Sequence, residues 1–358
     1  MREKAVRVAG DKSPLTREEV CSVIEGRART RRVPMFIHFW VHPDEFGPRK
    51  QAVIEMLERY PCDLLCGSFH MPTNYRNDDP KYPDYAWLPY ADPFKGRQVA
   101  LDEAIALDDW GKLDEVIANF PRADFPALLE WMPKSDGRYR LAHWWFCLFE
   151  RHWSLRGMTN ALTDYYEYPA ETHRLFGALT DFYCDIIARC AEEVPFDGLW
   201  TSDDLGTQVS GFFSPEIFRE FFKPYYRRIF ETCHSRGIHT WMHACGCVRE
   251  FIPDWLDCGL DVLHPIQKHT MDEGAIVREF GGRLTIFTGL DVQRVIPWGT
   301  PGEVRAEVRH LLDTFWRKGE GRCMITAGNG INGDCTLASL EAFLDESFNY
   351  VPSLAQGL

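Results

Sequence analysis

Polar residues that could do chemistry stand directly after apolar segments in the second half of the chain. One such segment ends in Asp203 and Asp204, and another ends in His243 with Cys245 two residues later. In a parallel α/β barrel, the residues that follow the strands meet at one end of the barrel, where active sites are built. We therefore expect these side chains to form one polar site. Further candidate substrate-binding residues in such positions are Gln208, His264, Gln267, Asp291, Gln293 and Asn329.

Asp203 and Asp204 are adjacent carboxylates and both are candidate catalytic residues. Successive side chains of a strand point to opposite faces, so the two cannot both face the interior. We expect Asp204 to face the substrate as an acid or base, an ion ligand or a partner of His243. Asp203 would then cap a loop or helix. In the alternative interpretation both carboxylates only cap loops.

Eight apolar segments predict the strands that must position these residues. The first shows no polar alternation, which is typical of a buried parallel strand, and helical patterns separate the segments. This order predicts an α/β fold, a (β/α)8 TIM barrel. His38, near the end of the first strand, is either a substrate contact or a core histidine. The predicted strands are 33–40, 62–67, 139–148, 196–201, 238–243, 261–264, 284–288 and 323–326.

Residues 68–134 lose this regularity and predict an elaborated loop insertion after strand two. The segment lies over the barrel mouth in this interpretation, and its aromatic residues either line the mouth or pack against the barrel. No linker divides the chain, so we expect a single domain over 1–358 with a helical N-terminal extension over 1–30. The aromatic residues of the insertion are Tyr75, Tyr82, Tyr85, Trp87, Tyr90 and Phe94.

Composition and motifs exclude several function classes. The formal net charge is −13, from 53 acidic and 40 basic residues, and no block of Lys or Arg favours nucleic acid or an anionic membrane. The start of the chain is charged, and no apolar run approaches the roughly 20 residues of a spanning helix, so we expect a cytoplasmic protein. The scattered cysteines indicate reduced thiols. Phosphate, dinucleotide and serine-nucleophile motifs are absent from the sequence.

Six stretches of sequence resemble, in this order, the uroporphyrinogen decarboxylase (URO-D) superfamily. The likeness covers most of residues 30–350. This family includes the heme-pathway decarboxylase and the zinc-dependent methyltransferases that move methyl groups between corrinoid proteins and thiols. The stretches are DDLGTQ, SPEIFREFFKPYYRRI, HACG, GLDVLHPIQ, GLDVQRVIPWGTPGEV and AGNGI.

The true decarboxylase carries an Arg-Gln-Ala-Gly-Arg stretch near its first strand, which holds the carboxylates of its substrate. Residues 37–42 read Ile-His-Phe-Trp-Val-His at that place. A highly carboxylated tetrapyrrole needs cationic partners, so uroporphyrinogen is not the expected substrate.

The methyltransferase branch holds zinc with a His-x-Cys pair and a distant Cys, and His243 and Cys245 match the pair. Residues two apart in an extended strand point the same way, so both could reach one ion. Asn329 stands at the place of the distant Cys, and an amide oxygen is a poor substitute for a thiolate. Cys323 or Cys247 could replace it. The alternative is a hydrogen-bonded histidine with a buried thiol beside it.

The resemblance thus implies an enzyme that transfers methyl groups with zinc and thiol activation, with a small-molecule substrate and a corrinoid protein as a possible methyl donor. A metal-independent decarboxylase or other lyase, acting on a small carboxylated substrate through Asp204, is the alternative. A third interpretation is a ligand-binding protein without chemistry. A homodimer is possible, and the substrate stays open.

Overall fold

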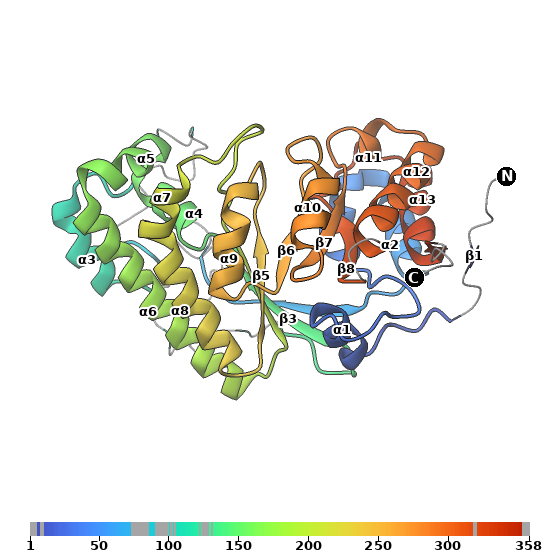
Figure 1. Cartoon of the computed structure of the whole chain (residues 1–358), viewed down its shortest axis with the longest axis horizontal. Coiled ribbons are helices and arrows are strands. Elements are labelled where there is room, and N and C mark those ends of the chain that lie inside the picture. Colours follow the sequence, from blue (N-terminus) through green and yellow to red (C-terminus); the bar gives the residue numbers. More distant parts are fainter. Residues whose placement is uncertain are drawn as a thin grey trace. The chain divides into compact units, whose positions relative to one another are not determined.

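The computed structural model describes residues 6–7, 11–72, 86–89, 100, 103, 105–121, 123, 129, 132–317 and 321–352. Within these ranges parallel strands alternate with helices along the chain, which is the predicted α/β fold (Figure 1). The chain groups into two compact units. The first contains Met1–Leu65, Lys134–Arg140 and Asp261–Leu358, and the second contains Cys66–Pro133 and Leu141–Leu260.

The second unit is built on β3 (Tyr139–Trp144), β4 (Gly198–Ser202) and β5 (His239–His243), which pair in parallel and in chain order. Every residue of β4 is buried, as expected for a strand with helices around it. Helices α6 and α8 lie side by side (Figure 1). The helices described in this unit include α3 (Leu113–Ala118), α4 (Phe149–Arg156), α5 (Met158–Glu167), α6 (Pro169–Glu193), α7 (Pro215–Ile217), a π-helix (Phe218–Phe222), α8 (Lys223–His234) and α9 (Ile252–Cys258).

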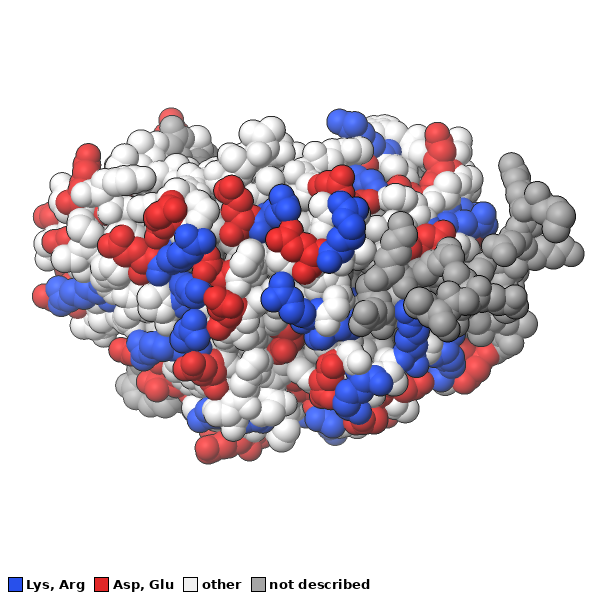
Figure 2. Space-filling view, viewed as in Figure 1, with Lys and Arg blue, Asp and Glu red and all other residues white. Residues whose placement is uncertain are grey.

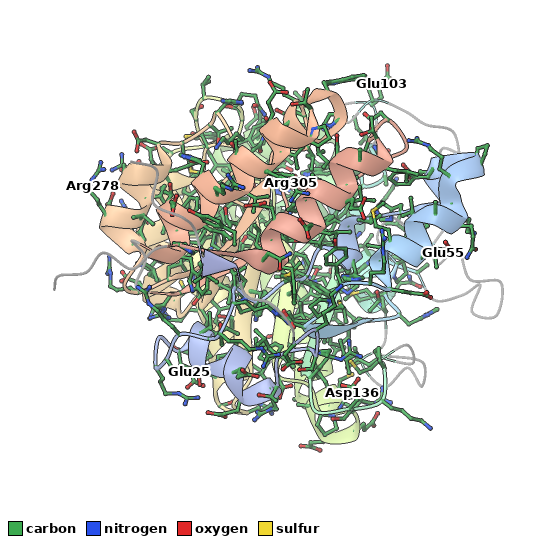
Figure 3. All side chains as sticks on the ribbon, turned by 90° about the vertical axis from the view of Figure 1, so that its right-hand side faces the viewer. Glu25, Glu55, Glu103, Asp136, Arg278 and Arg305 are labelled. Atoms are coloured by element: carbon green, nitrogen blue, oxygen red, sulfur yellow. The ribbon has the colours of Figure 1, made fainter. Side chains whose placement is uncertain are left out.

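The first unit is built on β6 (Val262–His264), β7 (Thr285–Leu290) and β8 (Cys323–Ala327), again parallel and in chain order. Two of its helices are joined by Arg305 of α12, which donates to Asp345 of α13 at 2.6 Å (Figure 3). Its elements also include β1 (Val6–Arg7), α1 (Arg17–Ile24), α2 (Lys50–Leu57), α10 (Glu273–Phe280), α11 (Val295–Trp298), α12 (Pro301–Leu311), a π-helix (Leu312–Arg317), α13 (Leu337–Asn349) and β9 (Tyr350–Val351).

The prediction of a full strand over 33–40 is wrong. Only Met35 forms a β-bridge, a parallel one to Ile325 of β8. On its other side, Met35 donates its amide to the carboxylate of Asp63 at 2.7 Å and accepts from the amide of Asp63 at 3.1 Å. The carboxylate of Asp63 therefore occupies the position where a neighbouring strand would pair with Met35. After this point the chain forms a 3-10 helix over His38–Trp40. The other seven predicted strands are confirmed, with β2 at Leu64–Ser68.

Thr300 and Glu303 cap the start of α12. Thr300 accepts from the amide of Glu303 at 3.3 Å, and the Glu303 carboxylate accepts from the amide of Thr300 at 2.7 Å, which closes a capping box at the start of α12. On the face shown in Figure 2, acidic and basic side chains are interspersed. No helix in the part of the chain that is described has the length and apolar character needed to cross a membrane.

Most of the predicted insertion, including Tyr75, Tyr82, Tyr85, Tyr90 and Phe94, lies outside the described residues. Trp87 is described and fully buried, and its ring packs edge-on against Phe120 and Phe182. This tryptophan therefore belongs to the core of the second unit. The insertion itself and the single-domain organisation stay predictions.

Candidate functional site

Three predicted site residues come together in the second unit, and we call them the Asp–His–Cys cluster. The ligand atoms of Asp204, His243 and Cys245 all lie within 4.8 Å of one another. Nε2 of His243 is 3.4 Å from the Cys245 sulfur and 3.6 Å from Oδ1 of Asp204. One nitrogen, one sulfur and one carboxylate oxygen thus converge where β4 and β5 end.

Strand register explains the convergence. Ser202 of β4 lies opposite His243 of β5, so the segments that follow the two strands run beside each other. The amide of Asp203 donates to the carbonyl of His243 at 2.9 Å, and the amide of Cys245 donates to Oδ1 of Asp204 at 2.7 Å. Hydrogen bonds of the backbone therefore hold the Asp204 carboxylate beside the other two groups.

Two glycines allow these segments to approach closely. Gly246 has a φ of +84°, and a Cβ atom built on it would lie 2.2 Å from the carbonyl oxygen of Gly206. Only glycine adopts this conformation without strain and leaves this space empty. The Gly206–Gly246 contact therefore fixes the distance between the segment that carries Asp204 and the segment that carries Cys245.

Asp203 has a different position from its neighbour. Its side chain is fully buried and accepts from the amides of Leu148 at 2.8 Å and Glu150 at 2.7 Å, and from the hydroxyl of Tyr226 at 2.5 Å. Burial raises the pKa of Asp203 to about 6, against the opposing effect of these hydrogen bonds. Asp203 holds the start of α4, whereas Asp204 stands in the cluster with a side chain that is 41% exposed.

Glu150 is a site residue that the sequence analysis missed. It lies in the first turn of α4, is buried, and accepts a hydrogen bond from the hydroxyl of Ser202. Burial raises its pKa well above the usual range, and the negative charges of Asp204 and Asp203 raise it further. These effects therefore favour the protonated form of its carboxyl. The available signal was an acid directly after the apolar stretch 144–149.

Aromatic rings border the cluster. The ring of Trp145, the residue after β3, meets the ring of His243 at 5.8 Å, edge to face. Burial lowers the pKa of His243, and the nearby Asp204 acts in the opposite direction. Burial predominates, so the imidazole is neutral and has the protonation state of a metal ligand.

Two predicted site residues of the first unit take part in local structure. His264 is buried, with Nε2 2.9 Å from the carbonyl of Ala327 and its ring stacked on Trp40. Asp291 is buried and accepts from the amide of Gln293 at 2.8 Å. Each therefore has structural partners, whatever else it binds.

The polar amides differ in exposure. Gln267 is half-buried, and its backbone carbonyl accepts from the hydroxyl of Thr270 at 2.9 Å. Asn329 is exposed, and its side-chain oxygen accepts from the amide of Gly330 at 2.8 Å. Gln208 in the second unit and Gln293 in the first are also exposed.

The two predicted replacements for the third ligand lie in different surroundings. Cys323 is fully buried at the first residue of β8, where burial raises the pKa of its thiol far above the usual range. Cys247 is half-buried, and its amide donates to the carbonyl of Thr207 at 2.8 Å. Among the residues that are described, the group that completes the cluster is the carboxylate of Asp204.

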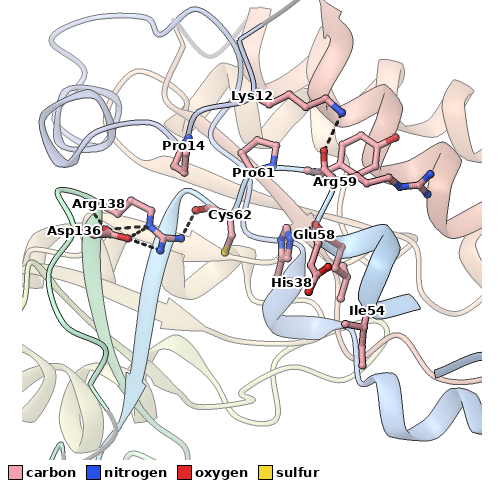
Figure 4. Close-up of a pocket in the computed structure, with 12 residues that line it drawn as sticks. Lys12, Pro14, His38, Ile54, Glu58, Arg59, Pro61, Cys62, Asp136 and Arg138 are labelled. Atoms are coloured by element: carbon pink, nitrogen blue, oxygen red, sulfur yellow. Dashed lines mark hydrogen bonds and ion pairs between the residues drawn. The ribbon is translucent and has the colours of Figure 1, made fainter. Parts of the chain in front are cut away.

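His38 lines a cavity of about 510 Å³ at the amino ends of β2 and β3 in the first unit (Figure 4). Its Nε2 is 3.0 Å from the carbonyl of Leu57, and burial lowers its pKa. Across the cavity, Arg138 donates to both carboxylate oxygens of Asp136. In barrel enzymes the amino ends of the strands serve stability, whereas chemistry takes place at the carboxyl ends. The cavity is therefore not the better candidate for an active site.

The donor set of the Asp–His–Cys cluster fits zinc. Zinc accepts imidazole nitrogen, thiolate sulfur and carboxylate oxygen, and catalytic zinc sites have three protein ligands and an open position. Magnesium and calcium prefer sites made of oxygen alone. The residues present are thus sufficient for a catalytic zinc site.

One solved structure shares the fold along nearly the whole chain. A methyltransferase from Methanosarcina mazei has a TM-score of 0.57 and 14% identity, and the match covers 93% of this chain and 98% of that one. The intracellular xylanase TsXylA from Thermoanaerobacterium saccharolyticum has a TM-score of 0.40 and 10% identity, and the match covers 87% of this chain and 89% of that one. No curated protein matches the sequence.

The family model described as uroporphyrinogen decarboxylase (URO-D) matches residues 153–350, which is more than half of the sequence. This match includes β4 and β5 and all three residues of the Asp–His–Cys cluster. The chain therefore belongs to the uroporphyrinogen decarboxylase (URO-D) family.

Proposed function

We propose that the chain is a zinc-dependent methyltransferase that activates a thiol. The observation that carries the proposal is the convergence of Asp204, His243 and Cys245 within 4.8 Å. The shared fold with a methyltransferase from Methanosarcina mazei supports it. Bound zinc would lower the pKa of a substrate thiol so that its thiolate can attack a methyl carbon.

In this proposal His243, Cys245 and Asp204 hold the ion, and Asp204 replaces the distant cysteine of the methyltransferase branch. Asp203 does not touch the substrate. It accepts the amide of Glu150 and the hydroxyl of Tyr226, and so keeps the segment before Asp204 in place. Glu150 accepts a hydrogen bond from Ser202, and burial raises its pKa, which favours its protonated form.

We further propose that the strands close into the predicted (β/α)8 barrel as one domain with an insertion over 68–134. A corrinoid protein is the proposed methyl donor. Gln208, Gln267, Gln293 and Asn329 are the proposed polar substrate contacts, because their side chains are half-buried or exposed. We propose no substrate contact for His38 and His264, because both bind backbone carbonyls.

Methyl transfer from free methylcobalamin to a small thiol tests the proposal. Zinc-loaded protein should remove the methyl group from cobalt, and Cys245→Ser should abolish this activity. Cys184→Ser is the matched control, since Cys184 is half-buried and contacts the hydroxyl of Thr232. Equal activity of the wild type and Cys245→Ser would contradict the proposal.

A metal-independent decarboxylase or other lyase is the second candidate. Glu150 favours it, because burial and the charges of Asp204 and Asp203 raise its pKa, and a carboxyl with a raised pKa can serve as a general acid. Carbon dioxide release from small carboxylated compounds by metal-free protein, lost in Asp204→Asn, would support this reaction. Unchanged turnover in Asp204→Asn would exclude it.

A further inference from the structure

The cavity of about 510 Å³ in the first unit has the properties of a binding site that is separate from the proposed chemistry (Figure 4). Its volume is within the range of about 300–1,000 Å³ that small-molecule sites have. All of its lining residues belong to the first unit, whereas the Asp–His–Cys cluster belongs to the second. A ligand of this cavity would therefore contact none of the proposed metal ligands.

One wall of the cavity is apolar. Pro61 is buried, and Ile54 and Leu57 of α2 are half-buried. His38 adds an uncharged imidazole to this wall, because burial lowers its pKa and its Nε2 is occupied by the carbonyl of Leu57 at 3.0 Å. A ligand therefore gains affinity from an apolar body that leaves water at this wall.

Three of the charged side chains around the cavity have ionic partners. Arg138 binds the carboxylate of Asp136 at 2.6 Å and donates to the carbonyl of Cys62 at 2.9 Å. Arg59 binds the carboxylate of Glu341 at 2.9 Å. The charges of these side chains are thus compensated within the protein, and they offer little to a charged ligand.

Lys12 is the cation of the cavity that keeps donors available. In the described part of the chain, its ammonium group contacts a carbonyl oxygen and a ring: Nζ donates to the carbonyl of Arg59 at 2.9 Å and lies 5.0 Å from the centre of the Tyr60 ring. An ammonium group has three N–H donors, so two remain for a ligand. The carbonyl and the ring hold the group in place, so a position for an anion exists before a ligand binds.

Glu58 offers the opposite charge to the same cavity. It is the C-cap residue of α2, and its amide donates to the carbonyl of Ile54 at 3.1 Å, which fixes its backbone. Its side chain is exposed, and the described residues provide no cation for its carboxylate. Lys12 and Glu58 lie apart, with Pro61 and His38 between them in the view of Figure 4. The cavity thus presents one positive and one negative charge at separate places.

We propose that this cavity binds a small zwitterion with an apolar body and two separated charges, such as a dipeptide. The carboxylate of the ligand binds the ammonium group of Lys12, its ammonium group binds Glu58, and its apolar side chain packs on Ile54 and Leu57. An α-amino acid carries both charges at one carbon atom, so it reaches only one of the two charged residues. The inference does not rest on the proposed function, because it concerns a different site.

Ligand-observed NMR titration of the full chain with leucylglycine tests the inference. Leucylglycinamide lacks the carboxylate, and N-acetyl-leucylglycine lacks the ammonium group. Each blocked form should bind about fivefold more weakly than leucylglycine, which is the effect of one exposed ion pair. Glycylglycine, which lacks the apolar side chain, should also bind more weakly.

Two substitutions assign the two charges. Lys12→Met should remove the preference for leucylglycine over its amide, and Glu58→Gln should remove the preference over the acetylated form. Lys50→Met and Glu55→Gln are the matched controls, because both residues are exposed on α2 and do not line the cavity. Both controls should keep both preferences. Thermal unfolding of each variant shows that it is folded.

Three results would overturn the inference: no saturable binding of leucylglycine, equal binding of leucylglycine and both blocked forms, or preferences that survive in Lys12→Met and Glu58→Gln. The first two are measured on the wild type. They decide the question even if Lys12→Met fails to fold after losing its bond to the Arg59 carbonyl.

Discussion

The amide of Cys245 donates a hydrogen bond of 2.7 Å to the carboxylate of Asp204, although the two residues are 41 positions apart in the chain. This bond places a carboxylate beside the His-x-Cys pair at the end of β5. In the proposed function, this carboxylate takes the place of the distant cysteine as the third ligand. In the proposed function Asp204 therefore has two roles: it orients the segment that carries Cys245, and it binds the ion.

Asp204→Asn separates these two tasks. Asparagine keeps an oxygen that can accept from the Cys245 amide, but it lacks the negative charge that zinc prefers. We expect zinc affinity to fall by about tenfold or more, while the free energy of unfolding changes by less than about 1 kcal/mol. Competition with a chromogenic chelator and urea denaturation measure the two quantities. Unchanged zinc affinity would mean that Asp204 is not a ligand.

Gly246→Ala tests the close contact between the segments after β4 and β5. The added Cβ would meet the Gly206 carbonyl at 2.2 Å, and alanine is strained at a φ of +84°. We expect the unfolding free energy to fall by about 2–4 kcal/mol and the metal affinity to fall with it. Gly237→Ala is the control. It has a φ of +70°, but its Cβ would have no atom within 4 Å, so only the conformational cost remains. Equal effects of both substitutions would contradict the importance of the contact.

Asp203 is predicted to serve stability. Asp203→Ala leaves two backbone amides and the Tyr226 hydroxyl without their acceptor, so we expect a loss of about 3 kcal/mol in unfolding free energy. Tyr226→Phe removes only one of these bonds and should cost about 1 kcal/mol. Chemical denaturation of both variants checks the difference. A folded Asp203→Ala variant with wild-type stability but no activity would show instead that Asp203 acts in catalysis.

His143 makes stability depend on pH. Burial lowers its pKa from 6.5 to about 4, so the unfolded chain binds a proton between these values that the folded chain does not. The stability contributed by neutral His143 is present above pH 6.5 and is lost as the pH falls towards 4, up to about 3 kcal/mol. Urea denaturation at several pH values should show this slope, and it should be smaller in His143→Gln. His42→Gln, at an exposed position, controls for the loss of an imidazole.

The pattern of apolar residues predicted most of the strands, because a buried parallel strand is a continuous apolar run in the sequence. Seven of the eight predicted strands are present. A full strand does not form over 33–40, because the carboxylate of Asp63 accepts the hydrogen bond of the Met35 amide. The pattern of apolar residues does not show whether a polar side chain elsewhere in the chain will take the backbone hydrogen bonds of a predicted strand.

The residues of the candidate site that stand at the ends of strands were predictable from the sequence. Asp204, His243 and Cys245 follow neighbouring strands, and parallel pairing brings such residues together. Glu150 and Trp145 were not found, because they lie on either side of a kink at Phe146 whose positive φ no sequence rule predicts for phenylalanine. His264 and Asp291 stand at strand ends as expected, yet their hydrogen bonds go to Ala327 and to the amide of Gln293. Position alone did not distinguish these roles.

Elemental analysis of zinc in freshly purified protein shows directly whether the Asp–His–Cys cluster holds a metal ion. The account predicts about one zinc per chain in the wild type and in the Cys184→Ser control, and much less in His243→Ala and Cys245→Ser. Circular dichroism establishes that each variant is folded. A wild-type protein that takes up no zinc, or a Cys245→Ser variant that keeps all of it, would contradict the account.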